Sequence, residues 1–250
     1  MESVKGILFI VSCHKYKDTR LKEFIQLPIS ISNYKVLIFM GDPRLTTYKV
    51  EDNLITLPCE DSYLHLFKKE CFALEFIKNH YIVEEGIMRI NDDCIINQEL
   101  LEAFLEMKKP GEYLGNVLPR TKEIHASQDY HLVEYYNHHK KDFDNPLHGI
   151  SELREKYKEL SVVPYCTLIP GYAVYLSWNA CNHILNYFKN CGYNSLHFDQ
   201  QYGYPFILED IAIGFILNKV GIFPQNYSFN SDILGASIVY HTNKYRELDF

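Results

Sequence analysis

Residues 86–94 read Gly-Ile-Met-Arg-Ile-Asn-Asp-Asp-Cys, an apolar run that ends on one amide and two carboxylates. The pattern predicts a buried strand over Gly86–Asn91, followed directly by Asp92 and Asp93. Carboxylates at the end of a buried strand are costly unless something compensates their charge. A hard divalent cation does so, because Mg²⁺ and Mn²⁺ prefer oxygen ligands and share them with substrate phosphates. The alternative is that the acid pair caps a helix predicted over Gln98–Met107.

Strand-like runs alternate with helical stretches through the first half of the chain. Strands are predicted over Val4–Ser12 and Lys35–Met40, with a weaker one over Asn53–Leu57. Helices are predicted near Thr19–Gln26 and over Ser62–Tyr81. This alternation is typical of an α/β fold with a mostly parallel central sheet flanked by helices. Such sheets bind ligands beyond the carboxyl ends of their strands, where the acid pair is expected.

The second half opens on a long polar segment, Pro119–Leu160, which we expect to form a lid or part of an acceptor site. Its five histidines fit no standard zinc spacing. Beyond it the sequence predicts a strand pair around Pro170-Gly171, over Val163–Ser177. Two helices follow, over Trp178–Asn190 and Ile211–Lys219, and Gly221 is expected to end the second of them. A last strand is predicted over Ser237–His241. We interpret the chain as one domain, with a donor-nucleotide half over about residues 1–118 and an acceptor half over about 119–250.

The composition of the chain argues against several classes of function. Hydrophobic residues make up 47% and charged residues 23% of the 250 residues, the balance of a soluble globular protein. The net charge of −7 argues against a nucleic-acid partner, which needs a basic face. Seven cysteines without close pairing favour free thiols in a reducing compartment. No window is long enough for a membrane span or signal peptide, so we expect a cytoplasmic protein, of viral or microbial type.

Four short motifs follow one another in a fixed order. They are Asp61-Ser62-Tyr63 with Lys69 on the same helix, Asn91-Asp92-Asp93, Pro164-Tyr165-Cys166 leading to Gly171-Tyr172, and Glu209-Asp210-Ile211 with Gly214. Together they resemble the β-1,3-galactosyltransferase and β-1,3-N-acetylglucosaminyltransferase family and its fringe-like relatives, over about residues 5–245. The resemblance implies a GT-A fold (Rossmann-like) and an inverting transfer of a sugar from a UDP-sugar to a hydroxyl of a glycan acceptor. It also implies Mn²⁺ or Mg²⁺ as cofactor.

The resemblance also assigns roles to single residues. Asp93 matches the last acid of the family's metal motif, and His241 lies where such enzymes supply a late histidine ligand. Asp210 matches the catalytic base, and Glu209 beside it would hold the acceptor or exchange roles with it. The remaining candidates are donor-binding residues: Asn91, Asp92, Asp61, Lys69, Arg20, Gly171 and Tyr172.

Two departures from the family pattern keep alternatives open. Asn91 stands where a first Asp is usual, which removes one negative charge, and only Gly171-Tyr172 remains of a glycine run. These departures are compatible with a catalytically weak or dead sugar-nucleotide-binding relative. A metal-dependent nucleotidyltransferase is the other alternative. It would need a glycine-rich phosphate loop after the first strand, and Ser12–Lys17 contains no glycine.

Overall fold

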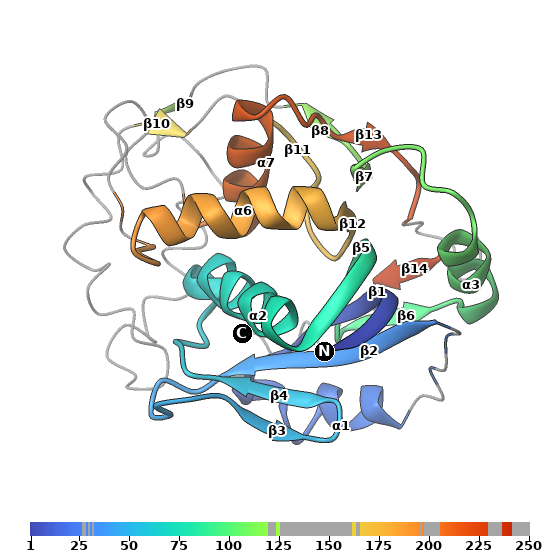
Figure 1. Ribbon diagram of the computed structural model, residues 1–250, viewed down its shortest axis with the longest axis vertical. Coiled ribbons are helices and arrows are strands. Elements are labelled where there is room, and N and C mark those ends of the chain that lie inside the picture. Colours follow the sequence, from blue (N-terminus) through green and yellow to red (C-terminus); the bar gives the residue numbers. More distant parts are fainter. Residues whose placement is uncertain are drawn as a thin grey trace.

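The computed structural model describes residues 1–26, 29, 31, 33–119, 124–125, 162–163, 166–195, 197, 206–229 and 237–241. Its centre is an eight-stranded sheet of order β13-β7-β12-β5-β1-β2-β4-β3, which crosses the molecule in Figure 1. The strands of this sheet are β1 (Glu2–Val11), β2 (Tyr34–Gly41), β3 (Lys49–Glu51), β4 (Leu54–Leu57), β5 (Tyr81–Asn91), β7 (Tyr113–Gly115), β12 (Ala173–Ser177) and β13 (Gln225–Asn226).

The sheet is parallel at its core and mixed towards its edges. Strands β5, β1, β2 and β4 run parallel to one another. Strand β12 runs antiparallel to both β5 and β7, and β3 runs antiparallel to β4. The α/β fold predicted from the sequence is confirmed. In its parallel part, the carboxyl ends of the strands lie at the same edge of the sheet.

Helices cover both faces of the sheet (Figure 1). One face carries α2 (Leu66–His80), α6 (Trp178–Asn190) and α7 (Glu209–Lys219), and the other carries α1 (Arg20–Ile25) and α3 (Gln98–Glu106). Alternate residues of β1 belong to different cores: Ile7 and Phe9 pack under α2, whereas Leu8 and Ile10 pack under α1 and α3. A strand buried on both faces reads as a continuous apolar run, as the sequence of β1 does.

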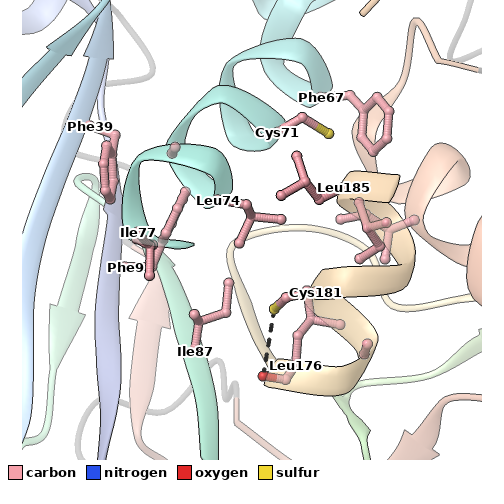
Figure 2. Close-up of a cluster of buried hydrophobic side chains, with 14 of the residues drawn as sticks. Phe9, Phe39, Phe67, Cys71, Leu74, Ile77, Ile87, Leu176, Cys181 and Leu185 are labelled. Atoms are coloured by element: carbon pink, nitrogen blue, oxygen red, sulfur yellow. Dashed lines mark hydrogen bonds between the residues drawn. The ribbon is translucent and has the colours of Figure 1, made fainter. Parts of the chain in front are cut away.

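The core under α2 and α6 is built from aromatic and aliphatic side chains. Figure 2 shows Phe9 and Phe39 of the sheet next to α2, which carries Leu74 and Ile77. The Phe9 and Phe39 ring centroids lie 4.7 Å apart in a stacked arrangement. This packing fixes the height of α2 over β1 and β2, and therefore the position of the loop that precedes α2.

Three predicted boundaries are wrong. The helix predicted over Ser62–Tyr81 begins with a 3-10 turn, Tyr63–His65, and α2 starts only at Leu66. Strand β5 starts at Tyr81 rather than Gly86, because Glu84 and Glu85 interrupt its apolar run and hide its first half. The predicted strand pair around Pro170-Gly171 consists of two strands that do not pair with each other.

Those two strands have other partners. Strand β11 (Thr167–Leu168) pairs with β8 (Leu118–Pro119), whereas β12 joins the main sheet between β5 and β7. A further ribbon, β9 (Ile124–His125) with β10 (Val162–Val163), brings the two ends of the polar segment together. Residues 126–161 lie outside the described residues, so the lid or acceptor role predicted for this segment stays a prediction.

Two expected absences can be checked on the described residues. All seven cysteines are described, and all are free thiols. Within the ranges given above, no helix is both long and apolar enough to cross a membrane.

Candidate active site

The carboxyl ends of β1, β2 and β5 meet at one edge of the sheet, because these strands are parallel and adjacent. Ser12 follows β1, Asp42 follows β2, and Asp92 with Asp93 follows β5. The Asp92 backbone N–H donates to the Val11 carbonyl at 3.1 Å, which ties the ends of β5 and β1 together. The edge where the sequence predicts a ligand site therefore carries a cluster of polar side chains.

The Gly171-Tyr172 motif lies beside the acid pair. The Asn91 backbone N–H donates to the Tyr172 carbonyl at 3.1 Å, where β12 runs alongside β5. Gly171 has a φ of +75°, a backbone conformation that glycine adopts without strain. The Gly171-Tyr172 part of the third motif is thus brought to the end of the strand that carries the second, whereas Pro164 and Tyr165 lie outside the described residues.

The late histidine is also brought to this edge. Strand β14 (Val239–His241) pairs antiparallel with β6 (Cys94–Ile96), and His241 lies opposite Cys94, the residue after Asp93. Its side chain lies outside the described part of the chain. The helix-cap alternative for the acid pair is wrong, because Asn97 caps α3 by accepting a hydrogen bond from the Leu100 N–H at 3.2 Å.

Asp92 is buried and held by two neighbours. Its Oδ1 lies 3.0 Å from Arg20 Nε, and its Oδ2 accepts a hydrogen bond from the Ser12 hydroxyl at 2.5 Å. Burial raises the pKa of Asp92 to about 6, although Arg20 and the Ser12 hydroxyl act in the opposite direction. The Asp92 carboxylate is thus fixed by the β1 end and by α1.

Arg20 bridges both acids. Its Nη1 lies 3.4 Å from Asp93 Oδ2, while its guanidinium carbon lies 3.5 Å from the centroid of the Tyr16 ring. Asp93 lies nearer the surface than Asp92, with 14% of its side chain exposed against 2%. Of the two carboxylates, Asp93 is therefore the one with access to a ligand.

The donor set of this edge suits a hard cation, although a complete cage is not formed by protein alone. Asn91 Oδ1 is buried and has no hydrogen-bond partner among the described residues. In the same ranges, no group of three or more His, Cys, Asp or Glu side chains is close enough to hold a metal ion. Mg²⁺ and Mn²⁺ sites commonly use one or two carboxylates and complete their shell with substrate phosphates, and Asp93 fits that pattern.

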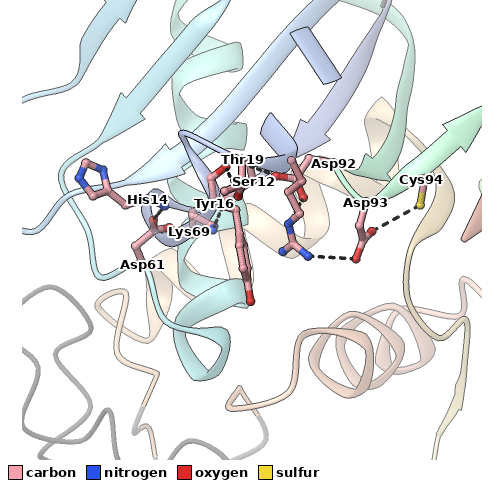
Figure 3. Close-up of polar contacts among 10 residues, drawn as sticks. Ser12, His14, Tyr16, Thr19, Asp61, Lys69, Asp92, Asp93 and Cys94 are labelled. Carbon is pink, nitrogen blue, oxygen red and sulfur yellow. Dashed lines mark hydrogen bonds and ion pairs between the residues drawn. The ribbon is translucent and has the colours of Figure 1, made fainter. Parts of the chain in front are cut away.

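Asp61 and Lys69 form a buried clamp on the other side of the Ser12 loop (Figure 3). Lys69 Nζ donates to Asp61 Oδ1 at 2.8 Å and to the Ser12 carbonyl at 2.6 Å. Asp61 also accepts from the backbone N–H groups of Gly41, at 2.9 Å, and His14. Burial acts to lower the pKa of Lys69, but Asp61 together with the thiols of Cys13 and Cys59 raises that pKa above its ordinary value. The pair thus holds the ends of β1 and β2 in place.

Helix α7 is anchored to β5 by a buried charge cluster. Arg89, on β5, donates through Nε to Glu70 Oε1 of α2 at 2.9 Å. Its Nη2 lies 2.9 Å from Oε1 of Glu209, the first residue of α7. Burial raises the pKa of Glu209 to about 8, against the lowering effect of Arg89. Burial also raises the pKa of Glu70.

Asp210 follows Glu209 in the first turn of α7. Its Oδ1 accepts a hydrogen bond from the Ile211 N–H at 2.8 Å. A carboxylate in this position is favoured by the helix dipole. Asp210 is partly exposed, whereas Glu209 is buried against Arg89. The two acids therefore occupy different environments, although they are neighbours in sequence.

Helix α7 also lies tightly against β11. A Cβ on Gly214 would lie 2.9 Å from the Leu168 Cβ and 3.0 Å from the Thr167 carbonyl oxygen. Asn218 joins the same strand, with its amide donating to the Thr167 carbonyl at 3.0 Å and its Oδ1 accepting from the Thr167 N–H at 3.2 Å. Gly221, with φ +79°, ends the helix as predicted.

No protein-family model matches the sequence, and no curated protein matches it. Among solved structures, the chain is similar to mouse xyloside xylosyltransferase 1 in its apo form, with a TM-score of 0.39 and 7% identity over 98% of this chain and 99% of that one. It is also similar to the apo structure of the bifunctional glycosyltransferase WbbM, with a TM-score of 0.38 and 9% identity over 97% of this chain and 46% of that one.

Sequence reasoning missed the partners that hold the site together. Arg89 lies in the predicted strand over Gly86–Asn91, but neither Arg89 nor Glu70 is among the site residues that the sequence predicts. A signal was present, because an arginine inside a buried strand demands a buried counter-charge. Lys69, predicted to bind the donor, has only 4% of its side chain exposed and is paired with Asp61.

Proposed function

We propose that this chain is an inverting glycosyltransferase of GT-A type, which moves a sugar from a UDP-sugar to a hydroxyl of a glycan acceptor. The observation that carries the proposal is the link from Glu209 through Arg89 to β5. It fixes the start of α7, with Asp210, to the strand that Asp92 and Asp93 follow. The motif resemblance further favours a β-1,3 linkage.

In this proposal the strand end holds the donor diphosphate. Asp93 and His241 would hold Mn²⁺ or Mg²⁺, and the bound cation would neutralise the charge that develops on the UDP leaving group. Asn91 offers an acceptor oxygen to a donor hydroxyl. Arg20 lies within reach of the same edge and adds positive charge against the diphosphate.

Asp210 acts as the general base. An acceptor hydroxyl has a pKa far above 7, so its attack on the anomeric carbon requires concurrent removal of its proton. Asp210 accepts that proton, the new carbon–oxygen bond forms, and the bond to UDP breaks on the opposite face of the sugar. Attack opposite the leaving group inverts the anomeric configuration.

Release of UDP tests this function. Wild-type protein is incubated with a panel of UDP-sugars and glycan acceptors in Mn²⁺, in Mg²⁺ and in EDTA. We expect UDP release with at least one donor in the presence of metal, and its loss in EDTA and in Asp93→Ala. No release with any donor, from protein that binds UDP, would contradict transfer.

That same outcome would favour the second candidate function, a sugar-nucleotide-binding protein without catalysis. The observation in its favour is that Arg20 already pairs with both Asp92 and Asp93. Asn91 also lacks the charge of the family's usual aspartate. Calorimetry with UDP, read beside the release assay, separates the two functions. A binding protein retains UDP affinity but releases no UDP from any UDP-sugar.

A further inference from the structure

We propose that Glu209 is a positioning residue, and that Arg89 and Glu70 act with it to fix Asp210 at the proposed site. This inference rests on the proposed function and deepens it. It replaces the role predicted for Glu209 from the motif, namely acceptor binding or exchange of roles with Asp210.

The geometry separates the two acids of the motif. Glu209 is 6% exposed, and its Oε1 lies 2.9 Å from Arg89 Nη2. Arg89 is 2% exposed, and its Nε donates a hydrogen bond to Glu70. A carboxylate that is buried and committed to an arginine is poorly placed to take a proton from an acceptor hydroxyl. Asp210, at the next position, is partly exposed.

The cluster joins three elements of the fold through charged side chains. Glu70 belongs to α2, Arg89 to β5 and Glu209 to α7. Arg89 is two residues before Asn91, where the strand end begins. A displacement of α7 along its axis would break the Arg89–Glu209 pair, so the pair sets the distance between the base candidate and the end of β5.

The cluster is also unequal in charge, with one cation between two carboxylates. Burial of both acids disfavours the state in which both are ionised. Arg89 Nη1 has no hydrogen-bond partner in the part of the chain that the structure describes. Charged or titratable groups on several elements interact electrostatically with the cluster: Tyr63, Lys69, Cys71, Cys94, Tyr113, Cys181 and Asp210.

A double-mutant cycle tests the proposal. Turnover is measured for wild type, Glu209→Gln, Asp210→Asn and the double variant, at saturating donor and below the melting temperature of each. If Glu209 acts through Asp210, Glu209→Gln should lower kcat by about tenfold to a hundredfold in the wild-type background, because small misplacements of a base are costly. In the Asp210→Asn background it should lower kcat by less than about twofold.

The matched control is Glu75→Gln. Glu75 lies on α2 like Glu70, but its partner is the exposed Lys189 at 3.6 Å, so its replacement should leave kcat unchanged. Glu70→Gln is the second test variant, in case Glu209→Gln fails to fold. It should lower kcat while the KM for the donor and the affinity for UDP stay within about twofold of wild type, because the donor site is untouched.

The outcomes separate this inference from the proposed function. The positioning role would be overturned if the kcat losses of the two single variants multiply in the double variant. It would also be overturned if Glu209→Gln folds and keeps wild-type kcat. In both cases the proposed transfer would still stand. Wild-type protein without transfer would overturn both.

Discussion

Glu209 Oε1, at the start of α7, lies 2.9 Å from Arg89 Nη2 on β5. This contact joins a helix that begins after residue 200 to the strand that ends at residue 91. It ties the start of α7, where Asp210 lies, to the strand that Asp92 and Asp93 follow. The proposed chemistry depends on that juxtaposition.

The first prediction concerns the metal. Asp93→Ala should abolish the strengthening of UDP binding by Mn²⁺, because the proposed cation joins the protein to the diphosphate. Titration calorimetry with UDP, in Mn²⁺ and in EDTA, measures this directly. Asn91→Asp is the matched variant: it restores the acid of the family pattern and should keep or increase the Mn²⁺ effect. Equal UDP affinity with and without Mn²⁺ in wild type would contradict the metal site.

The second prediction concerns pH. The pKa of Glu209 is raised in the folded protein to about 8 from an ordinary value of 4.5. The unfolded chain therefore loses this proton first, and the contribution of Glu209 to the free energy of unfolding falls as pH rises from about 4.5 to about 8. Glu209→Gln cannot lose a proton, so its stability relative to wild type should rise across that window.

Urea unfolding at several pH values measures the difference between the two proteins. Glu75→Gln serves as the control, because Glu75 is more exposed and paired with a surface lysine. A stability difference between wild type and Glu209→Gln that stays constant with pH would show that the Glu209 pKa is not raised.

The third prediction concerns the Asp61–Lys69 clamp. Lys69→Met leaves Asp61 buried without its cation and should lower the free energy of unfolding by about 3–5 kcal/mol. Asp61→Asn should have a similar effect for the same reason. Chemical unfolding of both variants tests this, with Lys49→Met as control, because Lys49 and its partner Glu51 are exposed and such pairs contribute at most about 1 kcal/mol. An unchanged Lys69→Met midpoint would contradict the clamp.

The fourth prediction concerns the contact of α7 with β11. Gly214→Ala places a methyl group 2.9 Å from the Leu168 side chain and 3.0 Å from the Thr167 carbonyl oxygen. Overpacking of this kind typically costs about 1–3 kcal/mol. Thermal unfolding should show the loss although alanine favours helices. A stability equal to or above wild type would show that β11 moves without cost.

The sequence predicted those features of the fold that depend on local sequence patterns. The alternation of apolar runs and helices was enough to predict the α/β fold, and the apolar run over Gly86–Asn91 was enough to place the acid pair at the edge where strand carboxyl ends meet. The glycine at position 221 predicted the end of α7. These features depend on residues close together in the chain, where periodicity and capping are informative.

Local sequence patterns did not predict which residues far apart in the chain pair with one another. The antiparallel place of β12 between β5 and β7 depends on contacts far apart in sequence. The same holds for Arg89, whose counter-charges come from α2 and α7, and for Lys69, whose pairing with Asp61 needs the 3-10 turn before α2. Local periodicity cannot reveal which distant carboxylate satisfies a buried cation.

The most direct measurement of the central claim is the turnover of Asp210→Asn, at donor saturation, beside its UDP affinity. Removal of a positioned general base typically costs about 10²–10⁴ in rate. We therefore expect Asp210→Asn to keep the fold and wild-type UDP affinity in Mn²⁺ while losing at least about a hundredfold in transfer. Near-normal turnover of Asp210→Asn would contradict the account, because the base would then lie elsewhere.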